Sequence, residues 1–326
     1  MKKAFITGGS GHVGSNLVRK LLKQGWCVRC LVHKDIRGLE GLDVELVNGD
    51  LLDSNFLAQQ MQGCYAVFHV AANVAVENID IELMEKINID GTKAMCRAAL
   101  KANIDRFIHF SSIHAFEQKP LFEILTEDRP LVSGVNSAPY DRTKASAELV
   151  VKKAYNEGLK TIIINPTGII GPYDYKPSRM GQVVLNIMNQ KMLFTINAGF
   201  NWVDVRDVCD AAIKSVDVGH YGQSYILPGR WASFEELAGI ISGIIGKNTR
   251  WITLPFWVAY CFLPFAYLSA KLRGKRPSFS KGSLHALAVQ AKKVSLDQAQ
   301  NKLNYQPRPL EETLKDTVDW MSNHVN

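Results

Sequence analysis

Long blocks of lysine and arginine are missing from this sequence of 326 residues, and no basic patch is interleaved with aromatic residues. Such features mark nucleic-acid-binding surfaces, so we expect no binding to nucleic acid. The 38 basic and 31 acidic residues are dispersed, and the small positive excess favours anionic small molecules or an acidic membrane surface. Internal repeats and low-complexity segments are also absent. The chain is long enough for one domain of about 160–200 residues and a smaller one.

Cysteine patterns that build disulfide frameworks or zinc sites are missing as well. The six cysteines are scattered, most of them in apolar stretches. Cys27 and Cys30 form a CxxC pair, but residues three apart in a strand face opposite sides, and no second pair completes a metal site. We expect reduced structural thiols and no bound metal. Met1, Lys2 and Lys3 lead directly into an apolar run, which leaves no room for a signal peptide and predicts a cytoplasmic protein.

A glycine-rich turn follows this first apolar run. Residues 5–14 read FITGGSGHVG, with glycines at the spacing GxxGxxG, and a helical pattern begins at once. Glycine is needed where the backbone takes positive φ or approaches a pyrophosphate, and a helix N-terminus presents amides to an anion. We predict a dinucleotide site here, although a turn required only for packing would show the same glycines. The expected contacts are Gly8, Ser10, Gly11, His12, Val13 and Gly14.

Strand-like and helix-like stretches alternate after this turn. Further strands are expected at residues 27–32, 44–48, 66–70, 106–110 and 161–165. The alternation predicts an α/β fold with a Rossmann-like doubly wound parallel sheet and a smaller C-terminal substrate domain. We expect an NAD(P)-binding domain over residues 1–165 with a return of chain near 205–227. Residues 166–326 are then mainly the substrate-binding domain.

The end of the second strand distinguishes NAD from NADP, because the residue there meets the adenosine ribose in this fold. An acidic residue would accept both ribose hydroxyls and repel a 2′-phosphate. His33, Lys34 and Arg37 instead offer positive charge to that phosphate. We therefore expect NADP. NAD is the alternative, since Asp35 could take the acidic role and the cations could be solvated loop residues.

Two later strand ends supply further cofactor contacts. Asp50 could accept from the adenine amino group while Leu51 covers the ring face; alternatively, Asp50 is a turn residue that caps the next helix. The fourth strand is followed by Ala71, Ala72 and Asn73. Small residues at the carboxyl end of a parallel strand leave space for a ligand at the sheet's switch point.

Three polar residues are candidates for acid and base chemistry. Tyr140 and Lys144 are four apart at the start of a predicted helix, so they project from one face. A lysine ammonium beside a phenol favours the phenolate, which would let tyrosine act near neutral pH. Ser112, at the end of the fifth strand, could hydrogen-bond the same substrate oxygen. Each has an ordinary alternative, because YxxxK occurs on helix surfaces and serine can simply end a strand.

Six motifs, in this order, resemble the extended short-chain dehydrogenase/reductase family over essentially the whole chain. They are TGGSGHVG at 7–14, GDLLD at 49–53, HVAAN at 69–73, NIDGT at 88–92, FSS at 110–112 and YDRTK at 140–144. Three further stretches are most similar to the dihydroflavonol 4-reductase-like and 3β-hydroxysteroid dehydrogenase-like branch, which includes hopanoid-associated sugar epimerase-type relatives. They are SSIHAF at 111–116, NPTGIIGPYDYKPS at 165–178 and NWVDVRDV at 201–208. Family members often carry histidine at the position of Arg206.

The resemblance implies roles for individual residues. Tyr140 would exchange the proton, Ser112 would orient the substrate oxygen, and Lys144 would hold the nicotinamide ribose and lower the pKa of the tyrosine. Asn88 would be a fourth catalytic residue that holds a water next to the lysine. The residues implied to line the nicotinamide are Pro166, Thr167, Gly168 and Ile169.

Residues 251–270 carry no charge and are rich in aromatic residues and leucine. Length alone permits a membrane span, but Pro255 and Pro264 divide the run into pieces too short to cross as straight helices. We favour an apolar lid over the substrate, with a peripheral membrane contact through 251–276 as the main alternative. The cations that would support that contact are Lys271, Arg273, Lys275 and Arg276.

Three functions are compatible with these residues. We favour an NADP-dependent oxidoreductase that interconverts a ketone and a secondary alcohol on an apolar, dihydroflavonol-like or steroid-like small molecule. The alternative is an NAD-dependent nucleotide-sugar epimerase or dehydratase, whose diphosphate Arg179, Arg206 and Arg230 could bind. A non-catalytic dinucleotide sensor is the third, but it would need none of the three polar residues. A homodimer is an open alternative for the assembly.

Overall fold

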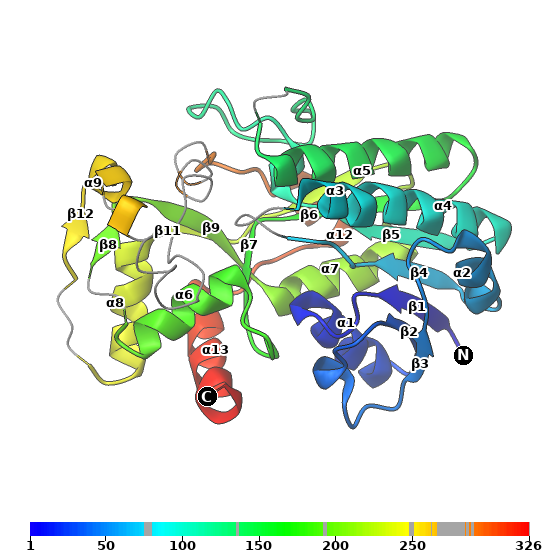
Figure 1. Ribbon diagram of the computed structural model, residues 1–326, viewed down its shortest axis with the longest axis horizontal. Coiled ribbons are helices and arrows are strands. Elements are labelled where there is room, and N and C mark those ends of the chain that lie inside the picture. The colour runs from blue at the N-terminus through cyan, green and yellow to red at the C-terminus, as the bar shows by residue number, and fades with distance from the viewer. Residues whose placement is uncertain are drawn as a thin grey trace.

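The computed structural model describes residues 1–74, 80–134, 137–191, 194–247, 251–261, 263–265, 284, 287 and 290–325. A seven-stranded parallel sheet forms its centre, in the order β10-β6-β5-β4-β1-β2-β3 (Figure 1). The strands are β1 (Lys3–Thr7), β2 (Cys27–Val32), β3 (Glu45–Asn48), β4 (Ala66–His69), β5 (Arg106–Phe110), β6 (Thr161–Pro166) and β10 (Ser224–Leu227). The strand order reverses between β1 and β4, which makes this edge the topological switch point. The predicted Rossmann-like doubly wound fold is confirmed.

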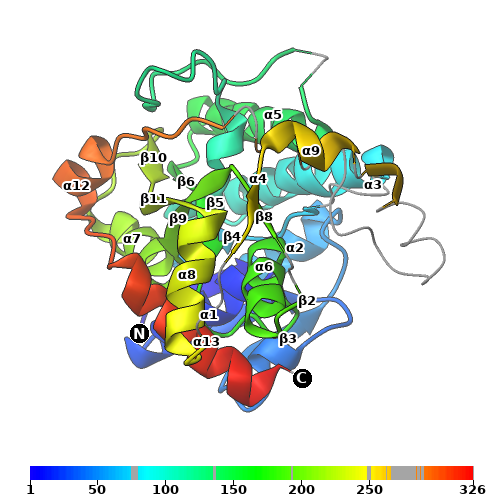
Figure 2. The ribbon, with the colours of Figure 1, turned by 90° about the vertical axis from the view of Figure 1, so that its left-hand side faces the viewer.

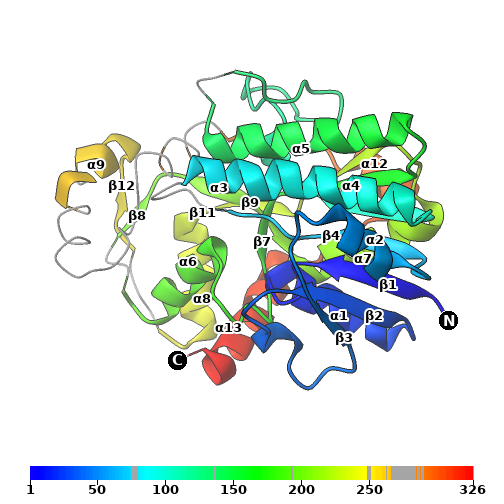
Figure 3. The ribbon, with the colours of Figure 1, turned by 45° about the vertical axis from the view of Figure 1, so that its right-hand side comes forward.

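Helices cover both faces of the sheet (Figures 1 and 3). One face carries α1 (His12–Lys23), α7 (Val205–Val218) and α12 (Asp297–Leu303), whose buried residues share a cluster with Ile6 and Phe68. The other face carries α2 (Ser54–Met61), α4 (Gly91–Lys101) and α5 (Pro139–Asn156), which pack with Phe5 and Val67. Because side chains alternate along a strand, the strands bury both faces and read as continuous apolar runs.

Short helical turns connect these elements near the switch point. The helical segment after β4 is one continuous stretch made of α3 (Ile81–Glu85), the π-helical turn η2 (Lys86–Asp90) and α4. Two 3₁₀ turns follow strand ends, η1 (Arg37–Leu39) after β2 and η3 (Ile113–Ala115) after β5. Turns of this kind place side chains at the carboxyl edge of the sheet, where ligands bind in doubly wound folds.

A third apolar cluster lies beside the sheet and is built from later parts of the chain. Here β9 (Gly199–Asp204) pairs with β7 (Gly168–Ile170) and β11 (Arg230–Ser233). Figure 2 shows α6 (Arg179–Met188), α8 (Phe234–Ile244) and α13 (Leu310–His324) gathered over these strands. Trp202 and Phe234 lie in the apolar cluster that these helices enclose. The cluster is separate from the two that flank the sheet, so it has its own apolar core.

The apolar stretch 251–270 is described at 251–261 and 263–265. It contains β12 (Thr253–Leu254), paired with β8 (Thr195–Ile196), and the short helix α9 (Phe256–Cys261). Trp257 and Phe265 are 67% and 66% exposed. The basic residues expected to assist a membrane contact, at positions 271, 273, 275 and 276, lie outside the described residues. Within the described part of the chain, no helix is long and apolar enough to cross a membrane.

Candidate active site

The glycine-rich loop at the end of β1 has no space for side chains. Gly8 has a φ of +72°, and a Cβ there would lie 2.7 Å from the amide nitrogen of Ala71 at the end of β4. A Cβ on Gly14 would collide with the carbonyl oxygen of Gly8. The backbone around β1 and β4 is therefore held close together, as an approach to a pyrophosphate requires.

The first turn of α1 faces the same loop. Gly11 is the N-cap and supplies no side-chain acceptor, and its own amide donates to Gly8 O at 3.1 Å. The helix has twelve residues, and no side chain caps its first backbone amides, so these amides can donate hydrogen bonds to a bound anion. Ser10 is half-buried, and a Cβ on Gly38 in η1 would lie 2.7 Å from its carbonyl oxygen. The cradle fits the pyrophosphate of a dinucleotide, and the sequence analysis missed the contribution of Gly38.

The side chain of His12 turns away from this cradle toward a loop after β7. Its Nε2 lies 3.2 Å from the carbonyl oxygens of both Gly171 and Pro172. One turn further along α1, the side chain of Asn16 donates to Pro172 O at 2.9 Å, and Ser15 donates to Tyr173 O at 3.1 Å. A contact from His12 or the half-buried Val13 to the cofactor would therefore come from the backbone. The hydrogen bonds that join α1 to the backbone of residues 171–173 were not predicted.

The cations after β2 are not equivalent. Arg37 is paired with Asp35 through Nε to Oδ1 at 2.9 Å and Nη2 to Oδ2 at 2.5 Å. These hydrogen bonds lower the pKa of Asp35 to about 2. His33 and Lys34 are exposed and have no ion-pair partner among the residues that the structure describes. The charge of Arg37 is therefore balanced by Asp35, and Asp35 is committed to Arg37, whereas Lys34 has no such partner in the described part of the chain. The predicted contact of Arg37 with a 2′-phosphate stays a prediction.

The loop after β3 separates two roles that the sequence left open. Asp50 is exposed, and its carboxylate accepts from the backbone amide of Leu52 at 3.0 Å. The cap of α2 is Asp53, whose side chain accepts from the amides of Asn55 and Phe56. Asp50 thus accepts within its own turn and does not cap α2, and its predicted contact with the adenine amino group stays a prediction. Leu51 is half-buried against Gly91, where a Cβ would lie 2.7 Å from its side chain.

A buried histidine connects β1, β4 and α4 directly below this edge. His69 lies 2.8 Å from Thr7 Oγ1 through Nδ1 and 3.0 Å from Thr92 Oγ1 through Nε2. Because Thr92 donates its proton to Asn88 O, Nε2 must be the donor and Nδ1 the acceptor. Burial lowers the pKa of His69 to about 3, which keeps this neutral tautomer. Thr7 in turn accepts from the amide of Ala71 at 3.2 Å, so the network fixes the end of β4.

Asn88 is committed to backbone and helix contacts. Its Oδ1 accepts from the amide of Asn73 at 2.7 Å, and its Nδ2 donates to Asn73 O and to Thr143 Oγ1 at 3.0 and 3.1 Å. Asn88 lies in the π-helical turn η2, so it ties the segment after β4 to α5. The predicted role of holding a water beside the lysine stays a prediction. Asn88 acts as a positioning residue for Asn73 and, with the half-buried Ala72, for the end of β4.

The three candidate catalytic residues converge at the carboxyl end of β5. Ser112 follows this strand as the N-cap of η3, and its hydroxyl hydrogen-bonds the phenol of Tyr140. Tyr140 and Lys144 lie on the first turns of α5, which Pro139 opens. The ammonium of Lys144 donates to Phe110 O at 2.9 Å, directly before the serine pair. A strand end and one helix face thus bring together residues separated by about thirty positions of sequence.

Burial controls the protonation of this group. It raises the pKa of Tyr140 to about 12, against the opposing effects of the Ser112 hydrogen bond and Arg179. It also lowers the pKa of Lys144 to about 8, and the negative charge of Glu148 counteracts that shift. The groups that lower the pKa of Tyr140 here are Ser112 and Arg179, and loss of solvent around the phenol outweighs both. The predicted lowering by Lys144 stays a prediction.

The strand junction after β6 lies beside this group. Pro166 ends β6, and Thr167 is buried with its hydroxyl donating to Asn201 Oδ1 at 3.1 Å. Gly168 and Ile169 are half-buried residues of β7. These four consecutive residues therefore connect β6 of the sheet to β7, which belongs to the third apolar cluster.

Two arginines proposed for a sugar diphosphate are already paired. Arg206 binds Asp204 through Nη2 at 2.7 Å and Asp316 through Nη1 at 2.5 Å. Arg230 binds Glu236 and Glu311. These pairs join β9, α7, β11 and α8 to the C-terminal helix. A diphosphate would have to displace carboxylates from both guanidinium groups, so neither supports a nucleotide-sugar substrate.

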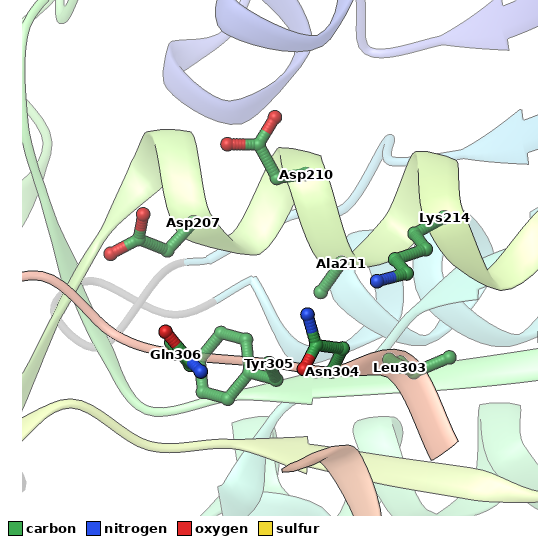
Figure 4. A pocket seen from close by; sticks show the side chains of 8 residues that line it. All are labelled: Asp207, Asp210, Ala211, Lys214, Leu303, Asn304, Tyr305 and Gln306. Atoms are coloured by element: carbon green, nitrogen blue, oxygen red, sulfur yellow. The ribbon is translucent and has the colours of Figure 1, made fainter. Parts of the chain in front are cut away.

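A cavity of about 220 Å³ lies on the opposite face of the sheet, between α7 and residues 303–306 (Figure 4). Two carboxylates line it, and both are already used: Asp207 binds Arg308, and Asp210 binds Lys20. Neither Ser112 nor Tyr140 nor Lys144 lines this cavity, and we assign it no chemistry.

Comparison with known proteins agrees with this geometry. The pattern of the NAD dependent epimerase/dehydratase family matches residues 4–226. A Synechocystis sp. protein named "Putative dihydroflavonol 4-reductase" is 33% identical, over 98% of this chain and 94% of that protein. Sterol demethylase protein B of Methylococcus capsulatus is 30% identical over 77% of each chain. The structure of UDP-glucose 4-epimerase from Thermotoga maritima superposes with a TM-score of 0.81, at 20% identity over 99% of this chain and 100% of that one. This chain therefore belongs to the NAD dependent epimerase/dehydratase family and is an NAD(P)-dependent enzyme of the extended short-chain dehydrogenase/reductase type.

Proposed function

We propose that the protein is an NADP-dependent oxidoreductase that interconverts a ketone and a secondary alcohol on an apolar small molecule. The observation that carries this proposal is the convergence of Ser112, Tyr140 and Lys144 at the carboxyl end of β5. When bound, the nicotinamide would supply or accept the hydride. Tyr140 would exchange the proton with the substrate oxygen, Ser112 would hydrogen-bond that oxygen, and the ammonium of Lys144 would bind the nicotinamide ribose.

The protonation of Tyr140 suits the role of proton donor to a ketone. A phenol whose pKa is raised to about 12 is protonated near neutral pH and can donate its proton to a carbonyl oxygen as the hydride arrives. In the oxidising direction the same group would accept the proton of the alcohol.

The relatives support an apolar ring system as the substrate class, because two of them are named for a dihydroflavonol and a sterol. In the proposed division, residues 1–165 with the return at 205–227 bind the dinucleotide. The remainder of 166–326 mainly binds the substrate.

The test is a substrate screen that follows the oxidation of NADPH at 340 nm. Dihydroquercetin and a 3-ketosteroid represent the two apolar classes, and UDP-glucose, followed by sugar analysis, represents the epimerase alternative. We expect NADPH consumption with an apolar ketone and none with UDP-glucose. Epimerisation of UDP-glucose by protein that retains NAD through gel filtration would overturn the proposal.

We propose NADP rather than NAD because Lys34 is the uncompensated cation after β2. Lys34→Ala is expected to weaken NADPH binding about 10-fold and to leave NADH binding nearly unchanged, since one charge-assisted contact to a 2′-phosphate is lost. Isothermal titration of both cofactors measures this. Lys23→Ala, at the exposed far end of α1, is the matched control. Tighter binding of NADH than NADPH by the unaltered protein would refute the assignment.

We also propose that the protein is cytoplasmic and makes a peripheral contact with an acidic membrane surface through residues 251–276. Ile252, Trp257 and Phe265 are each more than 60% exposed, and the sequence continues into four cations. Exposed aromatic side chains followed by basic residues are typical of segments that lie in the interface of anionic bilayers.

Sedimentation with vesicles of phosphatidylcholine and phosphatidylserine tests this contact. Trp257→Ser should lower the partition constant of the protein for these vesicles about 10-fold, because a large apolar side chain no longer enters the interface. Phe122→Ser removes an exposed aromatic ring elsewhere and should have no effect. Equal binding of both variants would contradict the proposal. A Trp257-dependent dimer in gel filtration would instead assign this surface to a second copy of the chain.

A further inference from the structure

A carboxylate lies buried on α5 directly behind the candidate catalytic residues. Glu148 is 0% exposed and follows Lys144 by one helical turn, so the two side chains project from the same face. That face packs against β5 and β6. An apolar side chain could fill this position without the cost of desolvating a carboxylate. A role for the negative charge would account for a carboxylate at this buried position.

Asn165 on β6 connects Glu148 to Ser112. Its Nδ2 donates to Glu148 Oε1 at 2.5 Å and to the carbonyl oxygen of Ser112 at 3.1 Å. Both partners are acceptors, so the orientation of the amide is determined, and a flipped amide would lose both bonds. Asn165 is itself 0% exposed. Glu148 thus fixes Asn165, and Asn165 fixes the backbone of the serine whose hydroxyl meets Tyr140.

Glu148 is also the counter-charge for Lys144. Among the described groups that act on the ammonium, it is the one that favours the protonated form. His69 on β4 and His109 on β5 lie nearby, but burial lowers the pKa of both, so they are neutral. Tyr140 is neutral as well, because burial raises its pKa to about 12.

Burial raises the pKa of Glu148 itself, whereas hydrogen bonds from Ser111 and Asn165 oppose that shift and favour the ionised carboxylate. The positive charges of Lys152, one turn beyond on α5, and of Lys144 act in the same direction as these hydrogen bonds.

We propose that Glu148 is a positioning residue for the proposed reaction: its carboxylate holds Ser112 in place through Asn165, and its negative charge keeps Lys144 protonated. The inference rests on the proposed roles of Ser112, Tyr140 and Lys144. Glu148 touches neither substrate nor cofactor in this arrangement and acts only through its two partners.

Two substitutions of the same residue separate the two actions. Glu148→Gln removes the charge and keeps an oxygen that can accept from Asn165, whereas Glu148→Leu removes both. Glu157→Gln is the control, because it neutralises an exposed carboxylate at the end of α5. Asn165→Ser removes the link to Ser112 and retains the charge, so it remains informative where the leucine variant does not fold.

The charge is tested without a substrate, by NMR titration of protein labelled with [ε-13C]lysine. The Lys144 signal is assigned from its loss in Lys144→Arg. Loss of a nearby negative charge favours the neutral amine, so Glu148→Gln should lower the pKa of Lys144 by about one unit from its value of about 8. The alkaline limb of the kcat/KM profile should move to lower pH by the same amount. Glu157→Gln should shift neither. An unchanged Lys144 pKa in Glu148→Gln overturns the role of counter-charge.

The positioning role is tested with the ketone that reacts fastest in the substrate screen. At pH 6, where Lys144 is protonated in all variants, Glu148→Gln should retain kcat within about 3-fold. Glu148→Leu and Asn165→Ser should lose about 10-fold in kcat with little change in cofactor KM. Wild-type kcat in both of these variants overturns the link to Ser112. Failure of the proposed function has a different signature, which is near-normal turnover in Tyr140→Phe with the Lys144 titration unaffected.

Discussion

Replacing Tyr140 by phenylalanine is expected to lower the chemical step by about 100-fold or more while cofactor affinity changes little. The phenol is the group that hydrogen-bonds Ser112, and burial keeps it protonated, so it is the proton donor that ketone reduction requires. Phenylalanine keeps the ring and its edge-to-face contact with His114. Single-turnover reduction, together with titration of NADPH, separates chemistry from binding.

Tyr155→Phe is the control for this change, because it removes a phenol from the exposed end of the same helix. Lys144→Ala should lower both turnover and cofactor affinity, since the ammonium is proposed to bind the ribose as well. Near-normal turnover in Tyr140→Phe would mean that the three residues have no catalytic role. The non-catalytic sensor would then become the best interpretation.

Gly14→Ala is expected to weaken cofactor binding about 100-fold. A Cβ at this position would collide with backbone atoms of Gly8 and Gly9, which cannot move aside as a flexible side chain could. Overpacking of this kind costs about 1–3 kcal/mol, and it displaces the loop that approaches the pyrophosphate. Isothermal titration with NADPH measures the loss, and the thermal shift on adding cofactor should shrink in parallel.

Gly239→Ala provides a matched control for that substitution. A Cβ on Gly239, inside α8, meets no heavy atom within 4 Å. Alanine should therefore leave cofactor binding unchanged and raise stability by about 1 kcal/mol through helix propensity. If Gly14→Ala binds NADPH as tightly as Gly239→Ala does, the loop around Gly14 is not the pyrophosphate site.

The local parts of this description could be read from the sequence. Strands of the sheet are continuous apolar runs, and the glycine spacing, the helix start and the Tyr140–Lys144 pair all depend on residues within one or two turns of each other. Periodicity and glycine geometry act over such short distances, so the sheet and the candidate catalytic pair were predictable. The family resemblance added the roles that the residues in these motifs were expected to play.

The tertiary structure alone decided how charges and protons are distributed. The pairing of Arg37 with Asp35 depends on loop geometry, and the bonds of His69 to Thr7 and Thr92 join three separate elements. The raised pKa of Tyr140 reflects everything that packs around the phenol. Desolvation and long-range hydrogen bonds are set by neighbours in space, which no spacing along the chain encodes. For that reason the sequence identified the chemical groups, whereas the fold determined which of them are neutral, paired or available.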